Sequence, residues 1–215
     1  RNLTYGTGMK GCATMLGQIL GITNFLTWIM TNPDEIKDLI ACWVETSLRY
    51  IKLMREVTGL PADTRGFSLQ SDLTGMLSPD LYREFILKAE AKIYNTFAPG
   101  ENDTRHYHSD YHMRHHLEAL REIGVNTVNI DPYIAPAQIL EKMPEVVIEG
   151  QIPPTQVLLY GSPEAVVECV KRDIAQAGRR RQLIQTTAGS INPGTSFANL
   201  KAICYAVEKY GYVYQ

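Results

Sequence analysis

The stretch TRHYHSDYHMRHHLEALREIGVNTVNID (residues 104–131) carries the pattern that decides the fold. Its first seven residues alternate as a short strand does, and residues 111–123 repeat apolar side chains with a helical period. Gly124 is placed to end that helix, and a second short strand follows over residues 127–131. A strand, a helix and another strand in this order predict a parallel unit, because parallel neighbours need a crossover connection.

The same alternation continues on both sides of this stretch. Further strands are predicted at residues 66–72, 146–151 and 182–188, and residues 2–5 have the pattern of the end of another. Helices are predicted at residues 14–30, 34–58, 79–97, 135–142, 163–177 and 197–209. We therefore expect an α/β chain forming a (β/α)8 TIM-type barrel. Because six strands cannot close eight and a typical barrel has about 250 residues, we expect about two N-terminal strands to be missing from this chain.

Composition limits the class of protein. The chain has 215 residues, 45% of them hydrophobic, which fits a single domain over residues 1–215. A net charge of −2 argues against nucleic acid or an anionic membrane as the main partner. Four scattered cysteines favour reduced thiols over a disulfide framework, and no apolar run approaches the roughly 18 residues of a membrane span. We expect a cytoplasmic protein.

All five histidines lie between residues 106 and 116. Side chains alternate along a strand, so His106, His108 and Asp110 should share one face. His108 and Asp110 are then about 6.6 Å apart along the strand, close enough to touch one ion or one substrate group. We predict catalytic or metal-binding roles for both. The alternative is a buried His–Asp hydrogen bond that closes the mouth of the barrel.

The other three histidines belong to the predicted helix. His115 points away from its apolar stripe and should be solvated. His112 and His116 have the i, i+4 spacing of a zinc helix, but Met113 stands where such a motif has its glutamate. His112, in the first turn, is retained as a substrate contact at the mouth.

Other polar residues follow the predicted strands. In a barrel of this type the chemistry lies at the carboxyl ends of the strands. Asp72 is predicted to be a second acid/base or orienting carboxylate, and Gln151, Gly189 and Ser190 to contact substrate. The backbone amides of residues 189–195, which open the last helix, should hold an anionic group of the substrate.

Four segments together resemble the uroporphyrinogen decarboxylase superfamily. They are SDLTGMLSPDLYREFI (71–86), YHSDYHMRHHLEALREIGVNTVNID (107–131), EGQIPPTQVLLYGSPEAVVECVK (149–171) and AGSINPGTSFANLKAICYAVEKYG (188–211). The resemblance runs over essentially the whole chain and corresponds to the C-terminal two thirds of a member. It implies a (β/α)8 barrel, and an activity either of haem-pathway decarboxylation or of methyl transfer with corrinoid proteins and thiols.

The decarboxylase branch implies a porphyrinogen substrate with eight carboxylates and no metal or cofactor. Its key arginines and aspartate belong to the N-terminal part, which this sequence lacks. Asp72 stands where that branch has a serine, and Gly189 where it has a histidine.

The methyltransferase branch implies zinc held by a His-x-Cys pair and one further cysteine. His108 matches the histidine, whereas Asp110 replaces the first cysteine and Gly189 the last. Zinc on His108 and Asp110 is therefore an oxygen-ligated candidate that departs from the thiolate pattern. We expect a methyltransferase that works with a corrinoid-carrying partner protein. The alternatives are a uroporphyrinogen decarboxylase with a tetrapyrrole substrate and a non-catalytic barrel subunit, and a homodimer is retained as a candidate assembly.

Overall fold

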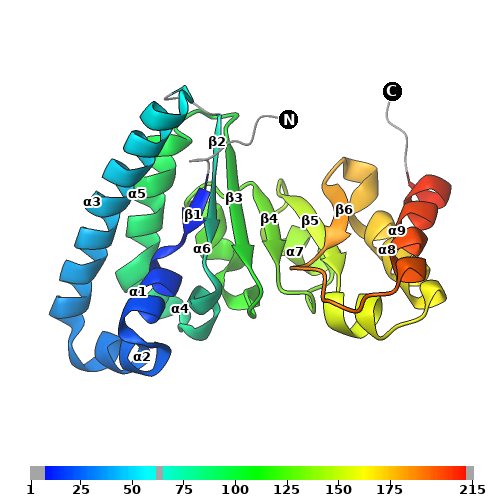
Figure 1. The fold of residues 1–215 in the computed structure, drawn as a ribbon, viewed down its shortest axis with the longest axis horizontal. Coiled ribbons are helices and arrows are strands. Elements are labelled where there is room, and N and C mark those ends of the chain that lie inside the picture. Colours follow the sequence, from blue (N-terminus) through cyan, green and yellow to red (C-terminus); the bar gives the residue numbers. More distant parts are fainter. Residues whose placement is uncertain (1–7, 62–64, 212–215) are drawn as a thin grey trace.

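The computed structural model describes residues 8–61 and 65–211. Its six strands form one parallel sheet in chain order (Figure 1): β1 (Gly8–Lys10), β2 (Gly66–Gln70), β3 (Thr104–Ser109), β4 (Thr127–Ile130), β5 (Val147–Ile152) and β6 (Leu183–Thr187). Parallel neighbours in sequential order, joined through helices, are the arrangement of a (β/α) barrel. Within the described residues β1 and β6 do not pair, so the sheet is a partial, open barrel. The expected fold class is confirmed.

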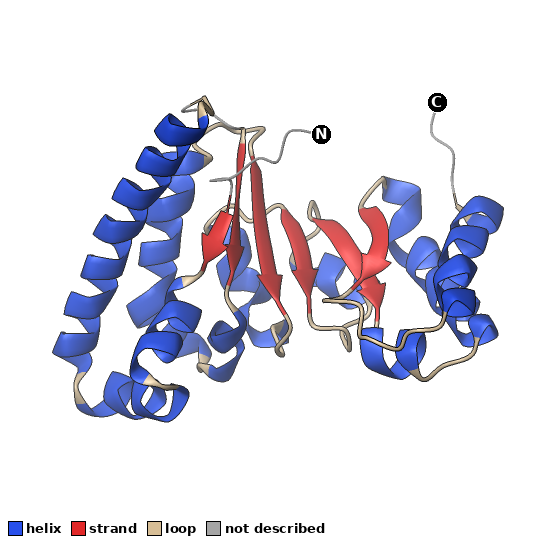
Figure 2. Cartoon of the chain, viewed as in Figure 1, coloured by secondary structure: helices blue, strands red, loops and turns tan. Residues whose placement is uncertain are grey.

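Helical segments connect each pair of strands (Figure 2). After β1 come α1 (Cys12–Leu20), α2 (Ile22–Thr31) and α3 (Pro33–Thr58). After β2 come η1 (Asp72–Met76), α4 (Pro79–Leu81), η2 (Tyr82–Ile86) and α5 (Leu87–Phe97). The remaining segments are η3 (Arg114–His116), α6 (Leu117–Glu122), α7 (Pro136–Lys142), η4 (Pro154–Leu159), α8 (Pro163–Ala177), η5 (Gly178–Arg180) and α9 (Phe197–Tyr210).

The main core lies between the sheet and these helices. Leu69, Tyr107, Val128 and Ile148, one from each of four neighbouring strands, are fully buried on this side. Because side chains alternate along a strand, the residues between them face the inside of the partial barrel. The side of the sheet that faces the helices is therefore hydrophobic. The other, concave side faces the inside of the partial barrel and is polar.

The predicted helix starts are confirmed by their caps. The hydroxyls of Ser78, Ser162 and Ser196 accept the N–H groups of the residues three positions on, at 3.3, 3.3 and 3.1 Å. Such caps supply acceptors that a helix start otherwise lacks.

The helix predicted over residues 14–30 is two helices. Gly21 has φ +84°, a conformation that glycine adopts without steric cost, and α1 and α2 meet there at a bend of 107°. Of the helices in the described ranges, none alone is long and apolar enough to cross a membrane, although this bent pair reaches the length and composition together.

Two other predictions are corrected at the carboxyl ends of strands. β2 ends at Gln70, so Asp72 begins a 3₁₀ turn instead of ending the strand. The helix predicted from residue 111 begins only after a 3₁₀ turn at Arg114, so His112 lies in the preceding loop and shares no helix face with His116. The strand end predicted at residues 2–5 lies outside the described residues.

Candidate active site

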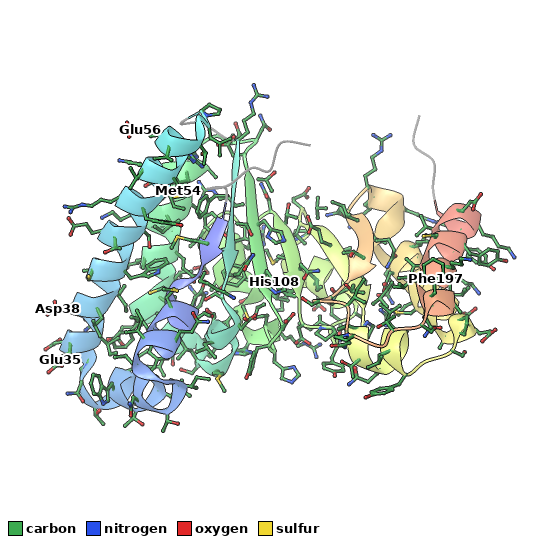
Figure 3. The ribbon with its side chains drawn as sticks, in the orientation of Figure 1. Glu35, Asp38, Met54, Glu56, His108 and Phe197 are labelled. Carbon is green, nitrogen blue, oxygen red and sulfur yellow. The ribbon has the colours of Figure 1, made fainter. Side chains whose placement is uncertain are left out.

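The strand register places His108 at the centre of the concave side. His108 pairs with Gln70 on β2 and with Asn129 on β4, and Figure 3 shows it in the middle of the sheet. The expected alternation holds, because His106, His108 and Asp110 all line the same hollow while Tyr107 is buried on the opposite side.

This hollow has a volume of about 500 Å³. Five of the predicted site residues line it: Asp72, His108, Asp110, Gly189 and Ser190. The structure adds seven others: Lys10, Gln70, His106, Asn129, Glu149, Thr186 and Thr187. Every lining residue except Gly189 has a polar side chain, and the volume is in the range of small-molecule sites.

Asp72, His108 and Asp110 form a compact cluster at the carboxyl ends of β2 and β3. One nitrogen or oxygen from each of the three lies within 4.8 Å of the others. His108 Nε2 is 3.6 Å from Asp110 Oδ1, and Asp72 Oδ1 accepts the backbone N–H of Asp110 at 3.0 Å. One imidazole nitrogen and two carboxylates at this spacing could hold a metal ion.

Asn129 fixes the tautomer of His108. Its amide nitrogen donates to the carbonyls of Glu149 and Thr187, so its Oδ1 is the acceptor for His108 Nδ1 at 2.8 Å. The proton of neutral His108 then lies on Nδ1, and Nε2 presents its lone pair to Asp110. A lone pair facing a carboxylate attracts a cation, either a proton or a metal ion.

Gly189 closes this side of the hollow. Its φ is +104°, and a Cβ added there would lie 2.5 Å from Asp110 Oδ1. Its N–H donates to Asn129 Oδ1 at 3.2 Å, and the N–H of Thr195 donates to Asn192. These two amides of the 189–195 turn are therefore already paired, and the expectation that the turn holds an anionic group stays a prediction for its other amides.

His106 lies one strand repeat from His108. Its Nδ1 is 2.7 Å from the hydroxyl of Ser68, and its Nε2 is 3.5 Å from Glu149 Oε2. Burial lowers the pKa of His106, and the nearby Glu149 carboxylate opposes that shift.

The three remaining histidines lie outside the hollow. His112 is largely exposed and sits 3.2 Å from a buried carboxylate oxygen of Asp131. Its role as a substrate contact at the mouth stays a prediction. His115 is exposed, as predicted. His116 is fully buried, with Nε2 3.0 Å from the Thr74 carbonyl oxygen, and burial lowers its pKa to about 4. A neutral, buried His116 is a structural residue and not half of a metal pair.

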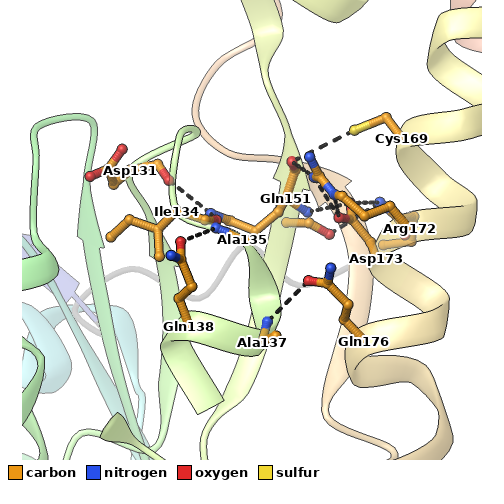
Figure 4. A network of polar contacts seen from close by, with 12 residues as sticks. Asp131, Ile134, Ala135, Ala137, Gln138, Gln151, Cys169, Arg172, Asp173 and Gln176 are labelled. Atoms are coloured by element: carbon orange, nitrogen blue, oxygen red, sulfur yellow. Dashed lines mark hydrogen bonds and ion pairs between the residues drawn. The ribbon is translucent and has the colours of Figure 1, made fainter. Parts of the chain in front are cut away.

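Gln151 is not among the residues that line the hollow and belongs instead to the buried polar network shown in Figure 4. Its side chain is fully buried and donates to the carbonyls of Ile130, Asp131 and Ile134. Its backbone N–H donates to Asp173 on α8. Gln151 was predicted to contact substrate, and this prediction is wrong, because its side-chain amide is buried and connects β5 to the end of β4 and the loop that follows it.

Sequence reasoning missed six lining residues: Lys10, Gln70, Asn129, Glu149, Thr186 and Thr187. The signal that could have found Asn129 and Gln70 is register: each is the neighbour of His108 on the adjacent parallel strand. Glu149 and Lys10 come from strands farther from His108, at β5 and β1.

A partial parallel barrel with polar residues at the carboxyl ends of its strands defines an α/β-barrel fold of the kind that carries enzyme sites. The family model for uroporphyrinogen decarboxylase (URO-D) matches residues 3–210. The chain belongs to the uroporphyrinogen decarboxylase family, as its sequence resemblance implied.

Individual relatives agree with this placement. A uroporphyrinogen decarboxylase of Prochlorococcus marinus (strain NATL1A) is 28% identical over 170 residues, which cover 79% of this chain and 46% of the relative. A uroporphyrinogen decarboxylase of Anaeromyxobacter sp. (strain Fw109-5) is 30% identical over 97 residues, which cover 45% of this chain and 28% of the relative. The chain thus spans at most about half the length of these curated relatives.

Among solved structures, a methyltransferase from Methanosarcina mazei superposes with a TM-score of 0.77. It is 17% identical, and the match covers 94% of this chain and 58% of that one. This likeness shows the fold.

Proposed function

We propose that this chain forms the active-site half of a methyltransferase that moves a methyl group between a small molecule and a corrinoid-carrying partner protein. The observation that carries the proposal is the cluster of Asp72, His108 and Asp110. Of the two activities that the family resemblance implies, methyl transfer is the one that uses a metal.

The donor set fits a divalent transition metal. Imidazole nitrogen and carboxylate oxygen suit zinc, iron, cobalt, nickel and manganese. The two thiolates of the zinc-thiol pattern are replaced by Asp110 and Gly189, so affinity for zinc should be lower than at a cysteine site. A bound ion would supply Lewis acidity, lowering the pKa of a thiol or polarising an oxygen that carries the methyl group.

The chain's own residues would hold this site in shape. Asn129 keeps the proton of His108 on Nδ1 and so leaves Nε2 free for the ion. Asp72 accepts the backbone N–H of Asp110 and fixes the turn that presents both carboxylates. Interactions of this kind orient metal ligands and are often as important as the ligands.

Exposed apolar side chains around the mouth support a docking partner. A hollow of about 500 Å³ admits a small molecule, so a corrinoid would be presented to it from outside. Large apolar or aromatic residues are exposed in segments that follow the carboxyl ends of five strands: Met76, Tyr111, Tyr133, Tyr160, Ile191 and Phe197. Phe197 at the start of α9 can be followed in Figure 3. Exposed apolar residues around a site are typical of surfaces that bind another protein.

Uroporphyrinogen decarboxylation is the second candidate, because the curated relatives of this chain carry that name. Its substrate has eight carboxylates. The described lining of the hollow has three carboxylates, Asp72, Asp110 and Glu149, and one ammonium group, Lys10. Like charges disfavour such a substrate here, which is why methyl transfer ranks first.

The two candidates are separated by assaying the full-length protein. We expect a divalent metal in the purified protein, and methyl exchange with methylcobalamin that His108→Ala abolishes. His115→Ala is the matched control, because His115 is exposed and outside the hollow. Decarboxylation of uroporphyrinogen that persists in His108→Ala would refute the proposal. Absence of both activities in a folded protein would favour a non-catalytic barrel subunit.

A further inference from the structure

His106 and Glu149 form a second polar wall in the same hollow. They come from β3 and β5 and both line it. His106 is two residues from His108, which places it about 6.6 Å away along the strand. The wall is therefore within reach of a short molecule whose other end sits on the Asp72–His108–Asp110 cluster.

The facing atoms of this wall have unused hydrogen-bonding capacity. His106 Nε2 is buried and has no hydrogen-bond partner, although Glu149 Oε2 is 3.5 Å away. Buried nitrogens of this kind are almost always paired with protein, water or ligand. An unpaired one on the wall of a cavity indicates where a ligand group belongs.

The tautomer of His106 defines what that group is. The Glu149 carboxylate favours a proton on Nε2, and Nδ1 then accepts the hydroxyl of Ser68 at 2.7 Å. The wall thus offers one donor, Nε2–H, beside one acceptor, the carboxylate. A hydroxyl can accept from the first and donate to the second, whereas an ammonium group only donates and a carboxylate only accepts.

We propose that His106 and Glu149 form a subsite that recognises a hydroxyl group of the small substrate. The substrate would be a short hydroxylated molecule with its reacting atom on the Asp72–His108–Asp110 cluster and its hydroxyl on this wall. The proposal rests on the proposed function for placing the small molecule in this hollow. Lys10, Asp72 and Asp110 also line the hollow and supply further charged groups to such a molecule.

Two thiols of equal size test the subsite. 2-Mercaptoethanol and 1-propanethiol differ in having a hydroxyl or a methyl group at the far end. In calorimetric titrations of the zinc-loaded full chain, we expect 2-mercaptoethanol to bind about tenfold more tightly, the effect of one to two net hydrogen bonds. Glu149→Met and His106→Phe should each reduce the ratio to about one. Glu145→Met, on the exposed turn before β5, should leave the ratio unchanged.

A second arm works without metal. In metal-free protein labelled with ¹⁵N-histidine, glycerol should shift the Nε2 resonance of His106, and 1-propanol should not. Glu149→Met should remove the glycerol shift.

The outcomes separate the subsite from the proposed function. Equal binding of the two thiols to the unsubstituted protein overturns the subsite and leaves the methyltransferase proposal in place. Absence of binding by either thiol argues against the methyltransferase proposal, and the glycerol arm then decides the subsite. A glycerol shift that depends on Glu149 supports it, and no shift overturns it.

Discussion

Replacing Glu90 with glutamine should change how the stability of the protein depends on pH. Glu90 on α5 is fully buried, and its Oε2 accepts the hydroxyl of Tyr82 at 3.0 Å. Burial raises the pKa of Glu90 from 4.5 to about 7, although hydrogen bonds from Tyr82, Ser71 and Tyr107 oppose that shift. Glu90 lies against the end of β1, because a Cβ on Gly11 would come 2.8 Å from its Oε1.

The size of the effect follows from the two pKa values. Between pH 4.5 and about 7 the unfolded chain loses the proton of Glu90 and the folded chain keeps it. The free energy of unfolding therefore falls as pH rises through this window, by about 3 kcal/mol in total, because each pKa unit corresponds to about 1.4 kcal/mol. Below pH 4.5 this contribution is fully present. Glutamine has no proton to lose, so Glu90→Gln should not show the fall.

Urea unfolding of the full chain, followed by circular dichroism from pH 4.5 to 8, measures the difference. His116 acts in the opposite sense, because its lowered pKa of about 4 makes the folded chain lose stability as pH falls below 6.5. Subtracting the unsubstituted curve from the Glu90→Gln curve removes that contribution. The difference should rise by about 3 kcal/mol towards pH 7, whereas exposed Glu208→Gln should give a flat difference. Parallel curves for Glu90→Gln and the unsubstituted protein would refute the reasoning.

Three further predictions concern the cluster and its support. Asp110→Cys should raise the affinity of the protein for zinc, measured by competition with a chromophoric chelator, because thiolate binds zinc more strongly than carboxylate. Asp80→Cys, at an exposed position, is the control. Equal zinc affinities of Asp110→Cys and the unsubstituted protein would contradict the metal site. Asn129→Leu should lower zinc affinity about 10- to 100-fold, since His108 loses the acceptor that fixes its tautomer; unchanged affinity in a folded variant would exclude that role. Gln151→Leu should lower the free energy of unfolding by about 2–4 kcal/mol, because it removes the side-chain hydrogen bonds to three buried carbonyls, and a change in thiol binding without loss of stability would restore its role as a substrate contact.

The fold could be predicted because its signals are local. The strand predicted at residues 104–110 is observed at 104–109, and the helix predicted at 163–177 is observed with those bounds. Alternation, helical period and a serine cap are each contained in a few neighbouring residues. The boundaries failed where distant contacts decide: His116 turns inward to reach the Thr74 carbonyl, forty-odd positions away in the sequence, which no local period predicts.

The site could be predicted only along one strand. His108 and Asp110 were found because alternation on β3 places both in the hollow. Strand alternation failed at Gln151, which should have shared a face with Glu149. α8 decides its position instead, since Asp173 accepts its backbone N–H and Arg172 donates to its carbonyl oxygen at 3.0 Å.

Asp110 and Gly189, the two departures from the zinc-thiol pattern, are neighbours in the structure. In the sequence they are 79 positions apart, and each replaces one cysteine of the zinc-thiol pattern. In the fold, a Cβ added at residue 189 would lie 2.5 Å from Oδ1 of Asp110. A side chain at 189 would therefore require the carboxylate of Asp110, the end of a half-exposed side chain, to move aside. Independently of that contact, the φ of +104° strains any residue with a Cβ at position 189, and this conformation favours glycine there. Gly189→Cys alone should consequently strain the turn and displace the carboxylate of Asp110, whereas the double change Asp110→Cys with Gly189→Cys removes the contact with the carboxylate and leaves the backbone strain at 189.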